Sequence, residues 1–113
     1  EESFEQSLCY VTDIVDGLAR LMKADLEVYL VNLGHDTIYK MRDVAEMIIK
    51  MTNSSSRVVF EPALAFLTSK GSPNLKRGKE QLGWVPLYRL EDGLQKTIDY
   101  AIANKEIMHL NNK

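Results

Sequence analysis

The sequence has a single cysteine, Cys9, and no long hydrophobic run. One cysteine cannot form a disulfide within the chain, and no apolar stretch approaches the roughly 20 residues that a helix needs to span a membrane. We also see no secretory signal segment at the start of the sequence. These absences exclude a disulfide scaffold and a membrane partner, and they predict a reducing, cytoplasmic location.

An excess of charge of either sign is also lacking. The 113 residues contain 14 lysines and arginines against 16 aspartates and glutamates, which gives a net charge of −2. Because cations and anions are interspersed along the chain, no basic face is evident for a phosphate backbone, and we expect no nucleic acid partner. No cluster of histidines and cysteines has the spacing of metal ligands. The length is that of one modest globular domain.

Glycine-rich turns are missing as well. Proteins that bind dinucleotides or ATP surround the phosphates with closely spaced glycines before a helix. The six glycines of this chain are far apart, at positions 17, 34, 71, 78, 83 and 93. We therefore predict that the chain by itself holds no dinucleotide cofactor.

The apolar pattern that is present predicts a small α/β or α+β lobe with about three short strands and four helices. The strands are expected at 7–11, 27–34 and 56–62. Helical spacing of apolar residues predicts helices at about 12–23, with Thr12 as N-cap, and at about 41–52. Three strands make a small sheet, so the helices would bury their apolar stripes only in part. We expect exposed apolar surface and a homo-oligomer.

The stretch from Asn74 to Ala101 predicts two further helices with a sharp corner between them. The side chain of Asn74 can accept a hydrogen bond from the first orphan backbone N–H groups, and Gly83 can end the helix in the left-handed conformation. Pro86 then prevents the helix from continuing. A Leu-Gly-Trp corner therefore separates the two helices.

Several isolated side chains are of types that can act in catalysis, and we interpret them as structural. Asp13 and Asp16 lie at the start of a predicted helix, where carboxylates stabilise the helix dipole, with acid–base work as the alternative. Cys9 lies in a short apolar stretch with nothing nearby in sequence to lower its pKa, which favours a small buried hydrophobe over a nucleophile. His35 follows Gly34 in a turn and is expected to be a solvated loop residue.

Four motifs stand in a fixed order along the chain. They are SLCYVTDIVDGLARLM at 7–22, VNLG at 31–34, DVAEMI at 43–48 and LGWVPLYRLEDGLQKTIDY at 82–100. In this order they resemble the C-terminal portion of the extended short-chain dehydrogenase/reductase family. The sequence looks most similar to nucleotide-sugar enzymes of the UDP-glucuronate decarboxylase kind, with dTDP-glucose dehydratases and hexose epimerases as neighbours. We interpret residues 1–104 as a substrate-binding C-terminal lobe and residues 105–113 as a polar tail.

The resemblance implies an NAD-binding Rossmann domain with a glycine-rich loop and a catalytic Tyr-x-x-x-Lys, followed by a lobe that closes over a nucleotide sugar. This chain lacks the catalytic pair, because its five tyrosines are followed four places on by Ile14, Leu33, Asp43, Asp92 and Asn104. We therefore expect no catalytic residue, cofactor or metal in the chain itself. The resemblance implies NAD for the parent protein and a partner in the missing Rossmann domain.

The resemblance also implies two substrate-binding positions. Relatives usually have an arginine two residues before the aromatic of the first strand, in a pattern like R-S-F-x-Y-V, and here that position is Gln6. A second arginine commonly precedes the Pro-Asp that opens the penultimate helix, and here Ser72 precedes Pro73. Both arginines are expected to bind the substrate's diphosphate through two-point contacts that glutamine and serine cannot make. Lys70 is the nearest cation to the second position, and it is either a looser substitute or a solvated loop lysine.

Two classes of function remain open from the sequence. The first is the substrate-binding lobe of an NAD-dependent nucleotide-sugar enzyme, most similar to a decarboxylase, with a 4,6-dehydratase or a 4-epimerase as alternatives. The second is a non-catalytic protein-interaction or oligomerisation module. A glycine-rich turn and a Tyr-x-x-x-Lys encoded upstream of Glu1 would favour the first class.

Overall fold

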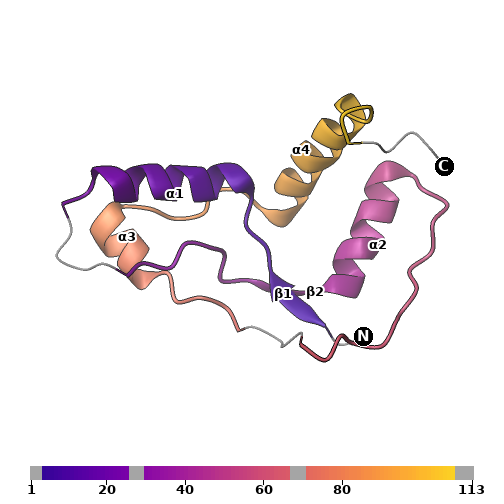
Figure 1. Ribbon diagram of the computed structural model, residues 1–113, viewed down its shortest axis with the longest axis horizontal. Helices are drawn as coiled ribbons and strands as arrows, with labels where there is room; N and C mark the ends of the chain where they lie inside the picture. The colour runs from indigo at the N-terminus through magenta and orange to yellow at the C-terminus, as the bar shows by residue number, and fades with distance from the viewer. Residues whose placement is uncertain (1–3, 26–29, 67–70, 109–113) are drawn as a thin grey trace.

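The computed structural model describes residues 4–25, 30–66 and 71–108 of the chain. Within them the elements are β1 (Glu5–Ser7), α1 (Val11–Lys23), β2 (Ile38–Lys40), α2 (Met41–Thr52), α3 (Lys76–Leu82) and α4 (Leu90–Ala103). The two strands form an antiparallel sheet. In Figure 1, α1 and α3 lie together at one end of the molecule, and α2 and α4 lie at the other end. The predicted small α/β lobe with four helices is confirmed.

The helices follow the sequence pattern closely. α1 and α2 cover the predicted ranges 12–23 and 41–52 almost residue for residue, because each has an apolar stripe at helical spacing. The prediction of Thr12 as an N-cap is wrong. Tyr10 precedes the helix without a side-chain cap, and its carbonyl oxygen accepts hydrogen bonds from the N–H groups of Asp13 and Ile14. Thr12 therefore lies inside the first turn.

The predicted corner between α3 and α4 is confirmed. The Asn74 side-chain oxygen accepts a hydrogen bond from the N–H of Lys76 at 2.9 Å, which satisfies one of the donors at the start of α3. Gly83 ends the helix with φ of +59°, in the left-handed region that favours glycine. The N–H groups of Gly83 and Trp84 then donate to the carbonyl oxygens of the last turn.

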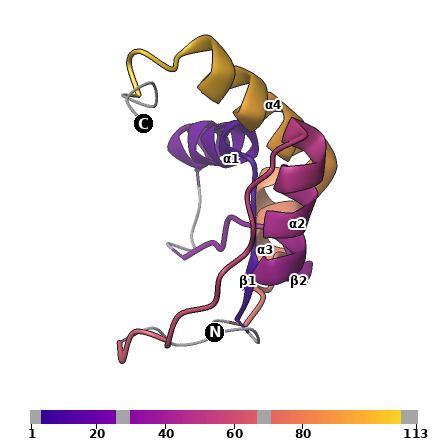
Figure 2. The same cartoon turned by 90° about the vertical axis from the view of Figure 1, so that its right-hand side faces the viewer.

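The strand predictions were largely wrong. β1 ends at Ser7 and so overlaps the predicted strand 7–11 by one residue, and residues 30–34 and 56–62 are not strands. Residues 27–29 lie outside the described part of the chain. The unpredicted β2 pairs with β1 over three residues. A strand needs a neighbour for its hydrogen bonds, and residues 53–66 run along the outside of the molecule, as Figure 2 shows.

The buried core is small. Its buried apolar side chains within the described residues are Val44, Leu82, Trp84 and Leu90. Much of the apolar stripe of α1 faces solvent, and Met22 is 86% exposed. Segments 53–66 and 84–89 add further exposed apolar side chains, such as Val59 and Leu87. The expectation that the helices bury their stripes only in part is confirmed.

Candidate functional site

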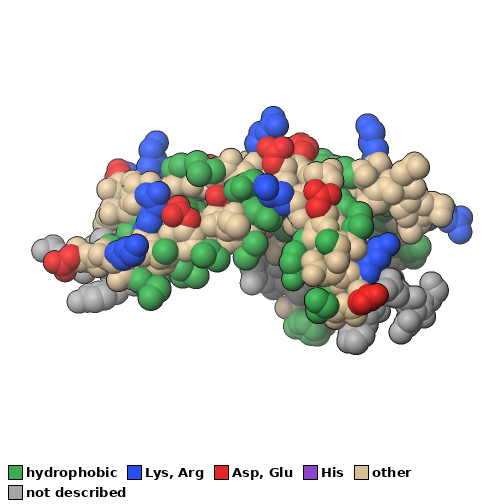
Figure 3. All heavy atoms as spheres, turned by 90° about the horizontal axis from the view of Figure 1, so that it is seen from above, with side chains coloured by type: hydrophobic (Ala, Val, Ile, Leu, Met, Phe, Trp, Pro, Cys, Tyr) green, Lys and Arg blue, Asp and Glu red, His purple; other side chains and the backbone are tan. Residues whose placement is uncertain are grey.

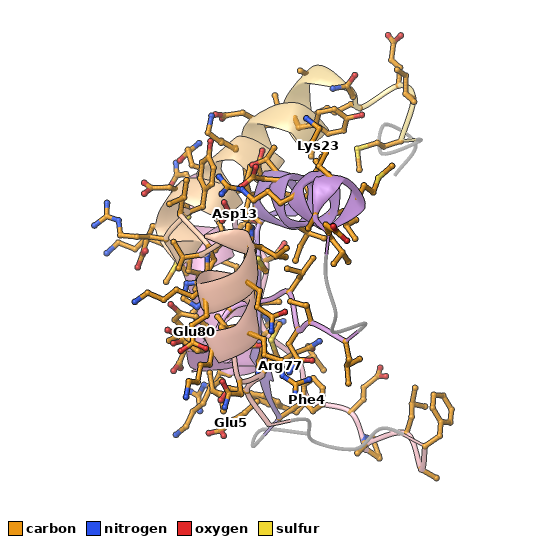
Figure 4. All side chains as sticks on the ribbon, turned by 90° about the vertical axis from the view of Figure 1, so that its left-hand side faces the viewer. Phe4, Glu5, Asp13, Lys23, Arg77 and Glu80 are labelled. Atoms are coloured by element: carbon orange, nitrogen blue, oxygen red, sulfur yellow. The ribbon has the colours of Figure 1, made fainter. Side chains whose placement is uncertain are left out.

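A buried carboxylate joins α1 to the corner between α3 and α4. Asp13 is 4% exposed, and its Oδ2 accepts hydrogen bonds from the N–H groups of Leu87 and Tyr88, each at 3.0 Å. Its backbone oxygen accepts a hydrogen bond from Trp84 Nε1 at 2.8 Å. Figure 4 labels Asp13 where α1 meets this segment. Asp13 lies in the first turn of α1, as predicted, and its carboxylate also binds backbone N–H groups that are distant in the chain.

Two glycines make room for the indole ring of Trp84. A Cβ atom at Gly17 of α1 would lie 3.1 Å from Trp84 Nε1 and 2.8 Å from a methyl carbon of Leu33. A Cβ atom at Gly78 of α3 would lie 3.4 Å from the Trp84 ring. The ring is 1% exposed, so the two helices approach each other around it. These glycines serve packing, which explains why their spacing does not match a phosphate-binding turn.

Arg20 fixes the end of α3 against α1. Its Nη1 donates hydrogen bonds to the carbonyl oxygens of Leu82 and Gly83, at 3.2 and 3.0 Å. Its Nε forms an ion pair with Asp16 one turn earlier at 3.1 Å. The carboxylate of Asp16 therefore orients an arginine that satisfies two helix-end carbonyls.

The segment before α3, which contains Ser72, lies beside residues 30–35. The side-chain amide of Asn32 donates a hydrogen bond to the carbonyl oxygen of Asn74 at 3.2 Å. The Pro73 ring lies close to Gly34, where a Cβ atom would be 3.2 Å from Pro73 Cγ. These contacts fix the position of the backbone that follows Ser72, whose side chain is exposed.

The other predicted position, Gln6, lies in β1 directly opposite Tyr39 of β2, and it is exposed. β2 follows residues 30–35 in the chain, so Gln6 and Ser72 both flank the stretch 30–40. Gln6 thus lies beside the end of this stretch, Ser72 precedes the proline that lies close to Gly34, and both positions have neutral side chains. Lys70 lies outside the described residues.

Arg77 is a cation beside the start of the stretch 30–40 that sequence reasoning overlooked. Its Nη1 donates a hydrogen bond to the carbonyl oxygen of Leu30 at 3.3 Å. A neutral carbonyl does not cancel the charge, and within the described residues the guanidinium makes no ion pair. No local pattern marks this arginine, because its partner lies 47 positions earlier in the chain. Arg77 leaves a positive charge beside the loop that precedes β2.

Residues 8–11 and the start of α4 enclose an apolar hollow of about 370 Å³. Cys9, Val11 and Leu94 contribute to its lining, and the rings of Tyr10 and Tyr88 meet nearby with centroids 4.7 Å apart. The Asp13 carboxylate accepts both of its hydrogen bonds from backbone N–H groups next to this hollow. Most of this lining is apolar and suits aliphatic or aromatic groups, and its cation Arg89 is paired with Asp92.

The predicted structural roles of Cys9 and His35 can now be compared with their surroundings. Cys9 is half-buried rather than buried as predicted, and burial raises the pKa of its thiol, with a further increase from the Asp13 carboxylate. His35 lies in a turn, where its Nδ1 accepts a hydrogen bond from the N–H of Thr37 at 3.1 Å. Its side chain is only 20% exposed, so the prediction that it is solvated was wrong. Because Nδ1 of His35 already accepts a hydrogen bond within the turn, this nitrogen is not free to act as a base.

We expect Cys9 to react slowly with iodoacetamide at pH 7. Because only the thiolate is nucleophilic, a raised pKa leaves less of the reactive form at neutral pH. Alkylation followed by mass spectrometry should give a native rate below that of glutathione, and unfolding in urea should accelerate the reaction. A native rate equal to the glutathione rate at pH 7 would contradict the environment described for this thiol.

Neither metal ligation nor membrane insertion is visible in the described part of the chain. Over these residues no three histidines, cysteines, aspartates or glutamates are grouped so that they could hold a metal ion. None of the described helices combines the length and apolar composition of a membrane span.

Sequence comparison identifies relatives over most of the chain. UDP-glucuronic acid decarboxylase 1 of Danio rerio is 34% identical over 100 residues, which are 88% of this chain and 23% of the relative. The chain spans about a quarter of the length of the curated relatives that it matches, and the matched part is C-terminal. No family model matches the chain. The predicted resemblance to the C-terminal portion of UDP-glucuronate decarboxylases is confirmed.

Comparison of structures identifies the fold. An epimerase from Methanothermobacter thermautotrophicus superposes with a TM-score of 0.91 and 21% identity, over 98% of this chain and 34% of the epimerase. UDP-glucuronic acid 4-epimerase from Bacillus cereus, in complex with UDP-glucuronic acid and NAD, superposes with a TM-score of 0.82 and 17% identity, over 91% of this chain and 33% of the enzyme. The described residues therefore have the fold of about one third of each of these two epimerases.

Proposed function

We propose that this chain is the substrate-binding lobe of an NAD-dependent nucleotide-sugar enzyme that acts as a UDP-glucuronic acid decarboxylase. The observation that supports the proposal most directly is the 34% identity to the Danio rerio decarboxylase across 88% of the chain. The fold shared with an epimerase that binds UDP-glucuronic acid and NAD supports the same class of substrate. In this proposal the role of the lobe is to bind and orient the sugar nucleotide.

In this proposal the substrate's diphosphate lies at the part of the lobe flanked by Gln6 and Ser72. Both side chains are exposed and able to donate hydrogen bonds, and Lys70 is the proposed nearby point charge. Arg77 adds a cation beside the same loop. Neutral donors bind a diphosphate more weakly than arginines do, so the proposed site has low affinity on its own.

NAD belongs to another domain in this proposal. The glycines at 17, 78 and 93 each lie against a side chain, and Gly83 ends a helix, so these glycines do not form a phosphate-binding turn. In the described residues these glycines form no turn that fits NAD, and in this proposal a Rossmann domain supplies that site together with the Tyr-x-x-x-Lys pair. We assign residues 1–104 to the lobe and 105–113 to a polar tail. A cytoplasmic location remains a prediction from the single cysteine.

A 4-epimerase is the second candidate. The solved structures described above are both epimerases, which favours it, but their identity to this chain is at most 21%. A 4,6-dehydratase and a non-catalytic module are further alternatives. In the proposed arrangement the reacting groups belong to the cofactor domain. The lobe therefore indicates a nucleotide-sugar substrate, but it does not distinguish a decarboxylase from an epimerase or a dehydratase.

We expect the purified chain to bind UDP weakly and NAD not at all. In a titration followed by amide chemical shifts, UDP should shift saturably the signals of β1 and of residues 71–77, because Gln6, Ser72 and Arg77 are there. NAD at the same concentrations should leave the spectrum unchanged. Uridine is the control for binding without a diphosphate. UDP shifts confined to other regions, or saturable binding of NAD, would contradict the proposed function.

A further inference from the structure

The imidazole ring of His35 is mostly covered and has one nitrogen open at the surface. Its side chain is 20% exposed. Nδ1 accepts a hydrogen bond from the backbone N–H of Thr37 at 3.1 Å. Within the described residues Nε2 makes no hydrogen bond, and no buried side-chain nitrogen there lacks a partner. Nε2 is therefore the nitrogen through which this ring reaches the surface.

The hydrogen bond within the turn also decides which nitrogen of the ring carries the proton. A ring nitrogen that accepts a hydrogen bond has no proton of its own, so the neutral imidazole has its proton on Nε2. Asp36 Oδ1 lies 3.5 Å from Nδ1, so this carboxylate approaches the ring at the nitrogen that the turn already occupies. The open group of His35 is thus an N–H donor, and the turn fixes its direction.

The chain on either side of His35 leads to the two positions proposed for the diphosphate. Gly34 precedes His35, and a Cβ atom at Gly34 would be 3.2 Å from Cγ of Pro73. Pro73 directly follows Ser72 in the chain. On the other side, β2 begins three residues after His35 and pairs with β1, which contains Gln6. His35 therefore lies in the short segment that connects the surroundings of Ser72 with those of Gln6.

The chemistry of this open donor matches a phosphate oxygen. In this tautomer Nε2 can only donate, and an ionised phosphate oxygen can only accept. A donor whose ring is already fixed also loses little conformational entropy when a ligand binds. On the face of the molecule in Figure 3, charged side chains of both signs are scattered rather than gathered into a basic patch. That face therefore offers no patch that would bind a diphosphate by charge alone.

We propose that His35 is a binding residue for the diphosphate, and that its Nε2–H donates a hydrogen bond to a phosphate oxygen of the nucleotide sugar. The inference rests on the proposed function, because it adds a donor to the diphosphate site proposed there. What it adds is a neutral donor with a fixed direction. A ligand without phosphate, such as uridine, does not use this donor.

Titration of the His35→Asn variant with UDP tests the proposal. Asparagine has an acceptor oxygen at the place of Nδ1, so the turn with Thr37 is kept, but it lacks the distal N–H. The dissociation constant for UDP should rise about tenfold, and uridine binding should not change. Thr37→Ala is the matched control, because it keeps the backbone N–H and should bind UDP as the wild type does. A His35→Asn variant that binds UDP as tightly as the wild type would overturn the proposal.

Proton–nitrogen spectra of the imidazole separate a failure of this inference from a failure of the proposed function. At about pH 8, where an ordinary histidine is neutral, the His35 ring should show its proton on Nε2, and its signal is identified by its loss in His35→Asn. UDP should shift this signal, and uridine should not. If UDP shifts the amide signals of β1 and residues 71–77 but not Nε2, the proposed function stands and the role of His35 is wrong. If UDP shifts none of these signals, the diphosphate site is wrong and the inference fails with it.

Discussion

Replacing Trp84 with alanine is expected to unfold a large fraction of the chain in water. Removing a buried aromatic ring costs about 3–5 kcal/mol of unfolding free energy, because apolar contacts are lost and a cavity remains. Trp84 is 1% exposed, and its Nε1 donates a hydrogen bond to the backbone oxygen of Asp13. Small domains have unfolding free energies near the low end of about 5–15 kcal/mol. The substitution therefore removes most of the available stability.

Urea unfolding followed by circular dichroism measures this effect, and two variants separate its causes. Trp84→Phe keeps an aromatic ring but removes the indole N–H, so the Asp13 carbonyl loses its partner and the cost should be roughly 1–3 kcal/mol. Leu87→Ala changes a side chain that is 75% exposed, and its effect should stay within about 0.5 kcal/mol. Equal losses for Trp84→Ala and Leu87→Ala would show that the corner does not hold α1 and α3 together.

Replacing Gln6 and Ser72 together with arginine is expected to tighten UDP binding by on the order of a hundredfold. Each hydrogen bond to a charged group contributes roughly 1.5–3 kcal/mol, so two arginines supply about 3 kcal/mol or more. A guanidinium also presents two parallel donors to a phosphate, which glutamine and serine cannot do. Both positions are exposed and flank the stretch 30–40, so longer side chains fit without repacking a core.

Calorimetric titration with UDP, at low and high salt, compares the wild type with this double variant. Salt should weaken binding in the variant more than in the wild type, since more of its affinity comes from charge. The double lysine variant at the same positions is the control for charge alone, and it should recover only part of the gain. If the wild type already binds UDP tightly and the arginines change nothing, the diphosphate binds elsewhere and the roles proposed for Gln6, Lys70 and Ser72 are wrong.

The helices could be predicted because their signals are local. The apolar stripes of α1 and α2 repeat at helical spacing within one segment, and neither helix needs information from elsewhere in the chain. Gly83 ends α3 as predicted, because the left-handed conformation is a property of that residue alone. The four motifs, taken in order, were enough to identify the family resemblance that the comparisons confirm.

The sequence positions named for the substrate came from that resemblance, and only the tertiary structure shows how they are placed. Gln6 and Ser72 are 66 residues apart in the chain, and they flank one stretch because Asn32 contacts Asn74 and β1 pairs with β2. Arg77 contacts the start of that stretch, at the carbonyl oxygen of Leu30, which lies 47 positions earlier in the chain. No local sequence pattern predicts these contacts, because each joins residues that are far apart in the chain.

The sequence by itself therefore determined the helices and the corner, which depend on residues close together in the chain. Tertiary structure decided the strands and the role of Asp13. Residues 56–62 have an apolar run but no neighbouring strand, whereas the short β2 forms because β1 lies beside it. Asp13 accepts hydrogen bonds from the N–H groups of Leu87 and Tyr88, which follow it by 74 and 75 positions in the chain. These donors come close to the buried carboxylate only after folding.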